Sequence, residues 1–375
     1  MKLLFVFHSL YSLAGGVDNR VSRLETSLPN TIHREYLLFK NQVNLPHKGE
    51  IFIAPYFKIP KYILHNKKSL KLLAYIYGFI TFIRRVIFTR KFIKNNHYNT
   101  LLAVDDYFAL ITLCASIGLN KKVVCSVRNN WDQIYNKRMV HLLPDFMYKK
   151  VLTILMNKYA SVIHCVSKGI EKNLREKYLV KNCLTIYNSF DINFIRAQGN
   201  KPIDLNCDFI INIGHFNAQK NQRDLLLAYA LLRSKGVKEY LVLVGDGNEK
   251  ERLKALAIEL KIDSFVIFVG QQQNPYKYLS KAKLYISSSL YEGLPAVLVE
   301  ALILNIPVVS YAFNYGAEEL TSCTAEMRPE NLASKSIEVL KNDTMKQVLI
   351  KEGEDKIKSY FNEEKIMRSW IKVLS

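Results

Sequence analysis

Two glutamates stand in a stretch whose spacing suits the binding of a phosphorylated ligand. Glu292 and Glu300 are separated by seven residues, and Gly293, Leu294 and Pro295 follow the first of them. Proline is favoured in the first turn of a helix, so a helix should begin near Pro295. The free amides at that helix start, around Gly293 and Leu294, would attract an anion such as a phosphate. Glu300 would then lie roughly 7.5 Å further along the helix axis.

This arrangement fits a nucleotide-sugar, with the diphosphate at the helix start, sugar hydroxyls at one carboxylate and ribose hydroxyls at the other. The alternative is that both glutamates are ordinary exposed helix charges, as most glutamates are. Short apolar runs at 283–287 and 306–311 predict a strand on each side of the stretch. The whole segment is therefore predicted to be one βαβ unit.

Strands and helices alternate along the rest of the chain. The predicted strands lie at 2–7, 35–39, 100–104, 122–127, 161–167, 208–213, 239–244, 264–269 and 284–288. Such alternation is typical of doubly wound parallel sheets, and we predict an α/β fold. The length of 375 residues leaves room for two domains of ordinary size.

Two further groups of candidate residues follow predicted strands in the first half. Gly15 and Gly16 come after the first strand and would let the backbone approach a ligand closely, although paired glycines are equally common in plain turns. Arg128 and Asn129 stand at the carboxyl end of strand 122–127. Open α/β sheets bind ligands at that edge.

Composition narrows the class of protein. The six cysteines are scattered singly, which argues against a zinc site or a disulfide scaffold and fits a reducing cytosol. No signal peptide is expected at the amino terminus, and the apolar run at 72–83 is too short to span a bilayer, so a soluble chain is expected. The net charge of +20 alone is compatible with nucleic acid, an anionic lipid surface or anionic small molecules.

Residues 51–104 concentrate this charge. They contain ten Lys and Arg residues, interleaved with aromatic residues, and no acidic residue. Apolar bodies with basic rims are typical of helices on an anionic membrane surface, which is the interpretation we favour. The alternatives are a core-packed helix with a solvated basic face, and base stacking on nucleic acid without a recognised module.

Several motifs occur in an order that resembles the retaining glycosyltransferases of family 4, the group 1 glycosyltransferases of bacterial surface-polysaccharide synthesis. They are Gly15-Gly16, Asn188-x-x-Asp191, Gly214 to Lys220-Asn221, Gly245-Asp246-Gly247 and Glu292-x7-Glu300 with its Gly-x-Pro. The resemblance implies the GT-B fold, in which two Rossmann-like domains face each other across a cleft. It places an acceptor domain at 1–190, a linker at 191–206 and a nucleotide-sugar domain at 207–357. The last helix, about 358–375, is expected to return to the first domain.

The resemblance also assigns roles. Lys220 would bind the donor diphosphate together with His215, which stands where the family usually has an arginine. The turn at Gly245 would face the donor. Glu292 would contact the transferred sugar and Glu300 the ribose.

The function implied is transfer of a sugar, with retention and without a metal ion or other cofactor. The donor would be a nucleotide-sugar, UDP-linked before GDP-linked. The acceptor would be a membrane- or lipid-linked saccharide of a polysaccharide, lipopolysaccharide or O-antigen. The protein is then expected in the cytoplasm, peripheral on the inner face of the membrane, without a nucleic-acid partner. Two alternatives are a GT-B sugar-phosphate enzyme and a non-enzymatic basic module for anionic lipid or nucleic acid.

Overall fold

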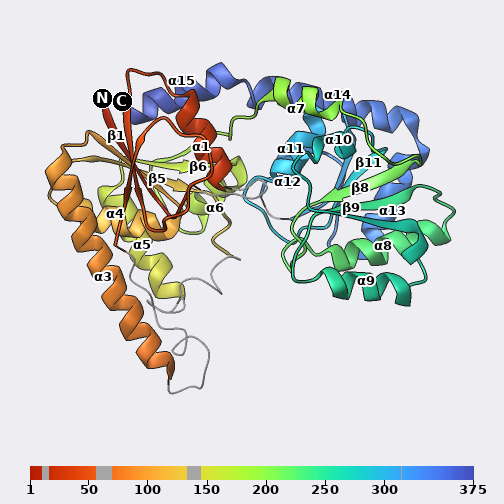
Figure 1. Ribbon diagram of the computed structural model, residues 1–375, viewed down its shortest axis with the longest axis horizontal. Helices are drawn as coiled ribbons and strands as arrows, with labels where there is room; N and C mark the ends of the chain where they lie inside the picture. The colour runs from red at the N-terminus through yellow and green to blue at the C-terminus, as the bar shows by residue number, and fades with distance from the viewer. Residues whose placement is uncertain (11–16, 56–69, 133–144, 314) are drawn as a thin grey trace. The chain divides into compact units, whose positions relative to one another are not determined.

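The computed structural model describes residues 1–10, 17–55, 70–132, 145–313 and 315–375 (Figure 1). The chain forms two compact units. The first contains Met1–Ser189 and Glu363–Ser375, and the second contains Phe190–Asn362.

The first unit is built on a seven-stranded parallel sheet in the order β3-β2-β1-β4-β5-β6-β7. Its strands are β1 (Lys2–Phe7), β2 (His33–Leu38), β3 (Glu50–Ile53), β4 (Thr100–Val104), β5 (Lys122–Val127), β6 (Val162–Cys165) and β7 (Cys183–Thr185). Its helices are α1 (Val17–Ser27), α3 (Leu70–Asn96), α4 (Asp106–Ser116), α5 (Asp145–Tyr159), α6 (Lys168–Glu176) and α15 (Glu363–Leu374). Apolar residues fill the central strands, since β4 is buried along its whole length.

The carboxyl-terminal helix α15 packs against this first sheet. Trp370 is buried with its ring 4.4 Å from that of His164 on β6. Thr100 on β4 donates a hydrogen bond of 2.8 Å to the carbonyl of Leu374. The apolar face of α15 is thus buried in the first unit.

The second unit has a six-stranded parallel sheet in the order β10-β9-β8-β11-β12-β13. Its strands are β8 (Phe209–Ile213), β9 (Tyr240–Val244), β10 (Val266–Gly270), β11 (Leu284–Ser287), β12 (Val308–Tyr311) and β13 (Thr324–Ala325). Its helices are α7 (Ile192–Gly199), α8 (Gln222–Ser234), α9 (Lys250–Glu259), α10 (Tyr276–Leu279), α11 (Ala296–Ile303), α12 (Ala317–Leu320), α13 (Pro329–Lys341) and α14 (Asp343–Tyr360).

Both sheets reverse their strand order once, and that reversal locates a ligand site. The first sheet reverses between β1 and β4, and the second between β8 and β11. Crossover helices leave such a point on opposite faces, so a crevice opens at the carboxyl ends of the two strands. The loop after β8 carries His215 and Lys220, and the loop after β11 carries Glu292.

The predicted α/β fold with doubly wound parallel sheets is confirmed. Three short edge strands, β3, β7 and β13, are absent from the predicted strands, because they have only four, three and two residues and bury too little apolar surface to give a pattern. Residues 191–206, expected as a linker, lie in the second unit and include α7, and the segment that returns to the first unit begins at Glu363. Within the described ranges, the structure contains no helix long and apolar enough to span a bilayer.

Candidate functional site

Two loops at the switch point of the second sheet are fastened together. The loop after β8 contributes Gln219 and Lys220, and the loop after β11 contributes Ser288, Leu290 and Tyr291. The amide of Leu290 donates to the carbonyl of Gln219 at 2.8 Å, and the Gln219 side chain donates to the carbonyl of Tyr291 at 2.8 Å. The Ser288 hydroxyl donates to the carbonyl of Lys220 at 2.9 Å. These hydrogen bonds therefore fix the positions of the candidate residues on the two loops relative to each other.

Lys220 and Glu292 form an ion pair between these loops. The Lys220 Nζ lies 2.6 Å from Glu292 Oε1, and the two side chains are 25% and 14% exposed. The side chain of Asn217 accepts a hydrogen bond of 2.9 Å from the amide of Lys220 and fixes the turn before it. An ammonium that is partly withdrawn from water, beside one carboxylate, can also bind a phosphate oxygen.

Glu300 lies on α11, which begins one residue after Pro295. Its side chain is buried, and the hydroxyl of Tyr276 donates to it at 3.4 Å. Gly293 and Leu294 are also buried, and their amides donate to no group in the described part of the chain. These two amides precede the helix start, where an anion is favoured.

The buried Tyr285 on β11 interacts electrostatically with both Glu292 and Glu300. Burial raises the pKa of the Tyr285 hydroxyl, and the charges of Glu292 and Glu300 raise it further. Both carboxylates therefore lie near the same tyrosine. The structure therefore brings together the three charged side chains that the family resemblance assigned to donor binding. Lys220 and Glu292 are in direct contact, and Glu300 and Glu292 lie near the same tyrosine.

The glycine turn after β9 has a structural role in this site. A Cβ at Gly245, where φ is +151°, would lie 1.9 Å from the carbonyl oxygen of Gly214. A Cβ at Gly247 would lie 2.3 Å from the carbonyl oxygen of Phe216, whose amide donates to the carbonyl of Asp246 at 2.9 Å. The turn thus packs on the loop that carries Lys220. We expected Gly245 to face a ligand, and the structure places the side of its missing Cβ against the protein backbone.

His215 is not joined to Lys220 by a hydrogen bond or ion pair in the part of the chain that the structure describes. Its side chain is exposed. It lies near Asp246, where a hydrogen bond from Lys250 chiefly holds the pKa of Asp246 below its ordinary value and the charge of His215 contributes. His215 therefore stands at the rim of the candidate site.

In the first unit, Arg128 lies at the carboxyl end of β5 and is buried. It donates a hydrogen bond of 2.7 Å to the side chain of Asn188, which precedes the second unit. Asn129 is half-buried. Gly15 and Gly16 lie outside the described residues.

A buried polar cluster at the switch point of the first sheet escaped the sequence analysis. Asp105 and Asp106 follow β4, and Asp105 has a φ of +79°, a strained value for a residue with a side chain. Asp106, Asn130 and Trp131 are buried, and one polar atom of each makes no hydrogen bond of normal geometry. The Trp131 indole nevertheless lies close enough to the Asp106 carboxyl to favour its charged form.

Burial, with the neighbouring charge of Asp105, raises the pKa of Asp106 to about 8. The signal available in the sequence was the Asp-Asp pair directly after strand 100–104, at the edge where ligands bind.

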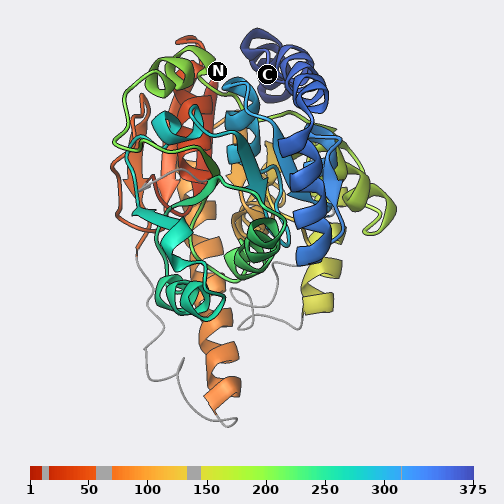
Figure 2. The ribbon, with the colours of Figure 1, turned by 90° about the vertical axis from the view of Figure 1, so that its right-hand side faces the viewer.

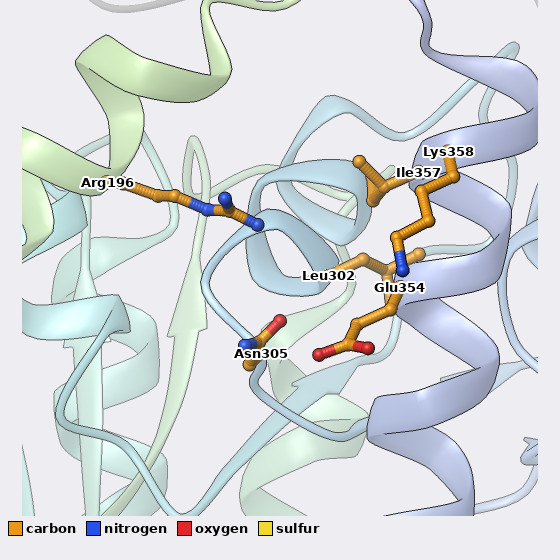
Figure 3. A pocket seen from close by; sticks show the side chains of 6 residues that line it. All are labelled: Arg196, Leu302, Asn305, Glu354, Ile357 and Lys358. Atoms are coloured by element: carbon orange, nitrogen blue, oxygen red, sulfur yellow. The ribbon is translucent and has the colours of Figure 1, made fainter.

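The second unit also has a hollow of about 140 Å³ between α7, α11 and α14 (Figure 3). It is lined by Arg196, Leu302, Asn305, Glu354, Ile357 and Lys358. None of the candidate residues lines it, and Arg196 donates to the carbonyl of Ile303 at 3.2 Å, which joins α7 to α11. We regard it as a packing feature. In the described residues no three His, Cys, Asp or Glu side chains gather as metal ligands would.

Comparisons with known proteins relate the chain to glycosyltransferases. Residues 193–356 match the family described as "Glycosyl transferases group 1". A Campylobacter jejuni protein named N-acetylgalactosamine-N,N'-diacetylbacillosaminyl-diphospho-undecaprenol 4-alpha-N-acetylgalactosaminyltransferase is 30% identical over 259 residues. That match covers 67% of this chain and 66% of the relative, slightly under two thirds of its length.

Other matches extend over the whole chain. A second Campylobacter jejuni protein, a GalNAc-alpha-(1->4)-GalNAc-alpha-(1->3)-diNAcBac-PP-undecaprenol alpha-1,4-N-acetyl-D-galactosaminyltransferase, is 22% identical, with 100% of this chain and 98% of the relative covered. The crystal structure of Anabaena HepE in complex with UDP has a TM-score of 0.73 at 19% identity, covering 100% of this chain and 99% of that one. This likeness confirms the GT-B fold.

Proposed function

Because this chain belongs to the group 1 glycosyltransferases, we propose that it transfers a sugar from a nucleotide diphosphate sugar to a lipid-linked saccharide in the synthesis of a bacterial surface polysaccharide. The observation that carries the proposal is the Lys220–Glu292 pair at the switch point of the second sheet. A positive charge and a carboxylate there suit a ligand with a diphosphate next to a sugar.

The donor binds through its diphosphate and ribose. Lys220 and the amides of Gly293 and Leu294 hold the diphosphate. Lys220 supplies a positive charge, and the two amides supply hydrogen-bond donors that have no acceptor in the described part of the chain. Glu300, further along α11, accepts the ribose hydroxyls. UDP is the favoured nucleotide, supported by the UDP in the structure of HepE.

Glu292 then acts at the sugar. Its carboxylate favours the positive charge that develops near the sugar ring as the bond to the diphosphate breaks. Lys220 stabilises the negative charge on the departing diphosphate, so no metal ion is needed in this mechanism. A diphosphate oxygen takes the proton of the acceptor hydroxyl on the same face of the sugar, and the anomeric configuration is retained.

The acceptor binds to the first unit. Arg128 and Asn129 stand at the carboxyl edge of its sheet, where a saccharide or its phosphate can reach them. A lipid-linked acceptor is supported by the two Campylobacter relatives, whose names describe undecaprenol-linked saccharides. The protein would then act at the inner face of the cytoplasmic membrane.

Isothermal titration calorimetry with UDP-, GDP- and ADP-sugars tests the donor site, with Lys220→Ala and Glu300→Ala as the variants. Lys356→Ala is the matched control, because Lys356 forms an ion pair of the same 2.6 Å length with Glu352 on α14, away from the site. One nucleotide class should bind to the wild type and the control, and at least about tenfold more weakly to both site variants. A wild-type protein that binds no nucleotide-sugar would contradict the proposal, and salt-sensitive binding to nucleic acid in its place would favour a basic binding module.

A further inference from the structure

Helix α3 exposes a stripe of isoleucines. Ile76, Ile80, Ile83 and Ile87 follow one another at intervals of four, three and four residues, so their side chains share one face of the helix. They are 46%, 42%, 38% and 62% exposed. Four large apolar side chains in one row on a surface are unusual unless they meet a partner.

This stripe is not the face by which α3 packs on its own unit. Phe82, Thr89 and Ile93 are buried on the other side of the helix, and α3 packs there against α4. The isoleucine stripe therefore takes no part in the packing of α3 against α4.

The charges beside the stripe are all positive. Arg84, Lys91 and Lys94 are exposed on α3, and residues 51–104 contain no acidic residue. Two copies of this helix brought face to face would place like charges together, which is unfavourable. An anionic lipid bilayer satisfies both features at once, because its phosphates attract the basic side chains and its acyl region accepts the apolar ones.

Helix α5 adds a second apolar contribution on the same side of the unit. Phe146 and Met147, in its first turn, are 71% and 41% exposed. Helix α4 packs against both α3 and α5. Figures 1 and 2 show α3, in orange, and α5, in yellow, extending toward the same end of the unit.

That end is the carboxyl edge of the first sheet. Helix α3 has 27 residues and is roughly 40 Å long, whereas the five-residue strand β4 that follows it spans about 17 Å. Only a short segment joins the end of α3 to β4, so the amino-terminal half of α3, with Ile76 to Ile83, projects beyond the carboxyl edge (Figure 1). The same edge carries Arg128 and Asn129.

We propose that the exposed stripe of α3 and the first turn of α5 form the surface by which the first unit binds an anionic lipid bilayer. The isoleucines, Phe146 and Met147 enter the boundary between headgroups and acyl chains, and Arg84, Lys91 and Lys94 contact lipid phosphates. The inference deepens the proposed function, on which its purpose rests, because it brings the acceptor edge of the first unit to the membrane that holds a lipid-linked acceptor.

Sedimentation with lipid vesicles tests the surface. The full chain is mixed with vesicles of phosphatidylcholine alone or of phosphatidylcholine with phosphatidylglycerol, neither containing a saccharide acceptor. We expect the wild type to sediment with the anionic vesicles, and Ile76→Ser/Ile80→Ser/Ile83→Ser to bind them at least about tenfold more weakly. Lys91→Gln/Lys94→Gln should weaken binding to the anionic vesicles and reduce its sensitivity to salt.

The matched control is Ile258→Ser/Val348→Ser, which removes two apolar side chains that are 64% and 59% exposed on the second unit. It should bind vesicles as the wild type does. Nucleotide titration of each variant reports on the second unit separately, so loss of vesicle binding with intact nucleotide binding isolates the surface. Wild-type binding by the triple serine variant would overturn the proposal. So would a wild-type dimer that this variant converts to a monomer while neither binds vesicles, since the stripe would then cover a second copy.

Discussion

The ammonium of Lys220 lies 2.6 Å from the carboxylate of Glu292, although 71 residues separate them in the chain. The pair joins the loops after β8 and β11, the two strands between which the second sheet reverses its order. Each side chain compensates the charge of the other before a ligand arrives. In the proposed mechanism a bound diphosphate would compete with Glu292 for Lys220, so the effects of a Glu292 substitution on binding and on chemistry can be measured separately.

Glu292→Gln should slow transfer without weakening nucleotide binding. The variant keeps the shape of the side chain but frees Lys220 from a competing negative charge, so the dissociation constant for the nucleoside diphosphate should stay equal or fall. Loss of the carboxylate at the sugar should lower kcat by about a hundredfold. Titration calorimetry and steady-state kinetics measure the two effects, and full activity in this variant would remove Glu292 from the mechanism.

Gly245→Ala should destabilise the protein and impair nucleotide binding, because the added Cβ would lie 1.9 Å from the carbonyl oxygen of Gly214 and displace the loop of Lys220. Gly236→Ala is the control, since Gly236 has a φ of +82° but nothing within 4 Å of an added Cβ. The control should lose about 1–2 kcal/mol in the free energy of unfolding from backbone strain alone. Urea unfolding of both variants measures the difference, and equal losses would mean that the contact with Gly214 relaxes freely.

His164 should make the protein less stable in acid. Burial, with the charge of Arg128, lowers the pKa of His164 to about 3, and its Nε2 lies 2.7 Å from the carbonyl of Ile186, so that nitrogen carries the hydrogen. The Ser126 hydroxyl then donates to Nδ1 at 2.8 Å. Below pH 6.5 the unfolded chain binds a proton that the folded chain does not, so stability falls as pH drops from 6.5 toward 3, by up to about 1.4 kcal/mol per pH unit.

Denaturant unfolding from pH 7 to pH 4 checks this slope against His164→Gln, which should lack that component of it. Replacement of the exposed His97 by Asn should leave the slope as in the wild type. A pH dependence shared by wild type and His164→Gln would show that His164 is not the source.

Asp106 should affect the pH dependence of stability in the opposite direction, and Asp106→Asn tests this. The folded chain keeps Asp106 protonated up to about pH 8, while the unfolded chain ionises it near 3.8, so its raised pKa costs stability increasingly as pH rises between those values. The variant removes this cost and should be more stable than the wild type at pH 7 to 8, with a smaller difference at pH 5. Asp204→Asn, at an exposed position, should show no such trend in the same unfolding experiment.

The sequence predicted the elements whose pattern is local. Buried strands such as β1 and β11 are mostly apolar, and the Glu-Gly-x-Pro stretch marked the start of α11 to within a residue. Contacts made across the fold could not be predicted in this way. The need for Gly245 arises from Gly214, which directly follows another strand, β8, and the burial of Asp106 depends on Trp131 and Tyr148, which come later in the chain.

The same limit applies to α3. The sequence showed a basic and aromatic segment, but which of its apolar residues are exposed depends on how α4 packs against the helix. Only the structure separates Ile76, Ile80, Ile83 and Ile87 from Phe82 and Ile93.

Sugar transfer itself tests the proposed function most directly. Purified protein is incubated with labelled UDP-sugars and a lipid extract that contains undecaprenyl-diphosphate-linked saccharides, and label in the lipid fraction is measured beside release of UDP. We expect one UDP-sugar to label the lipid. Glu292→Gln should reduce this labelling by about a hundredfold, Lys220→Ala should also reduce it strongly, and Lys356→Ala should retain it. Transfer that is undiminished in Glu292→Gln and Lys220→Ala would contradict the assignment of the site between β8 and β11.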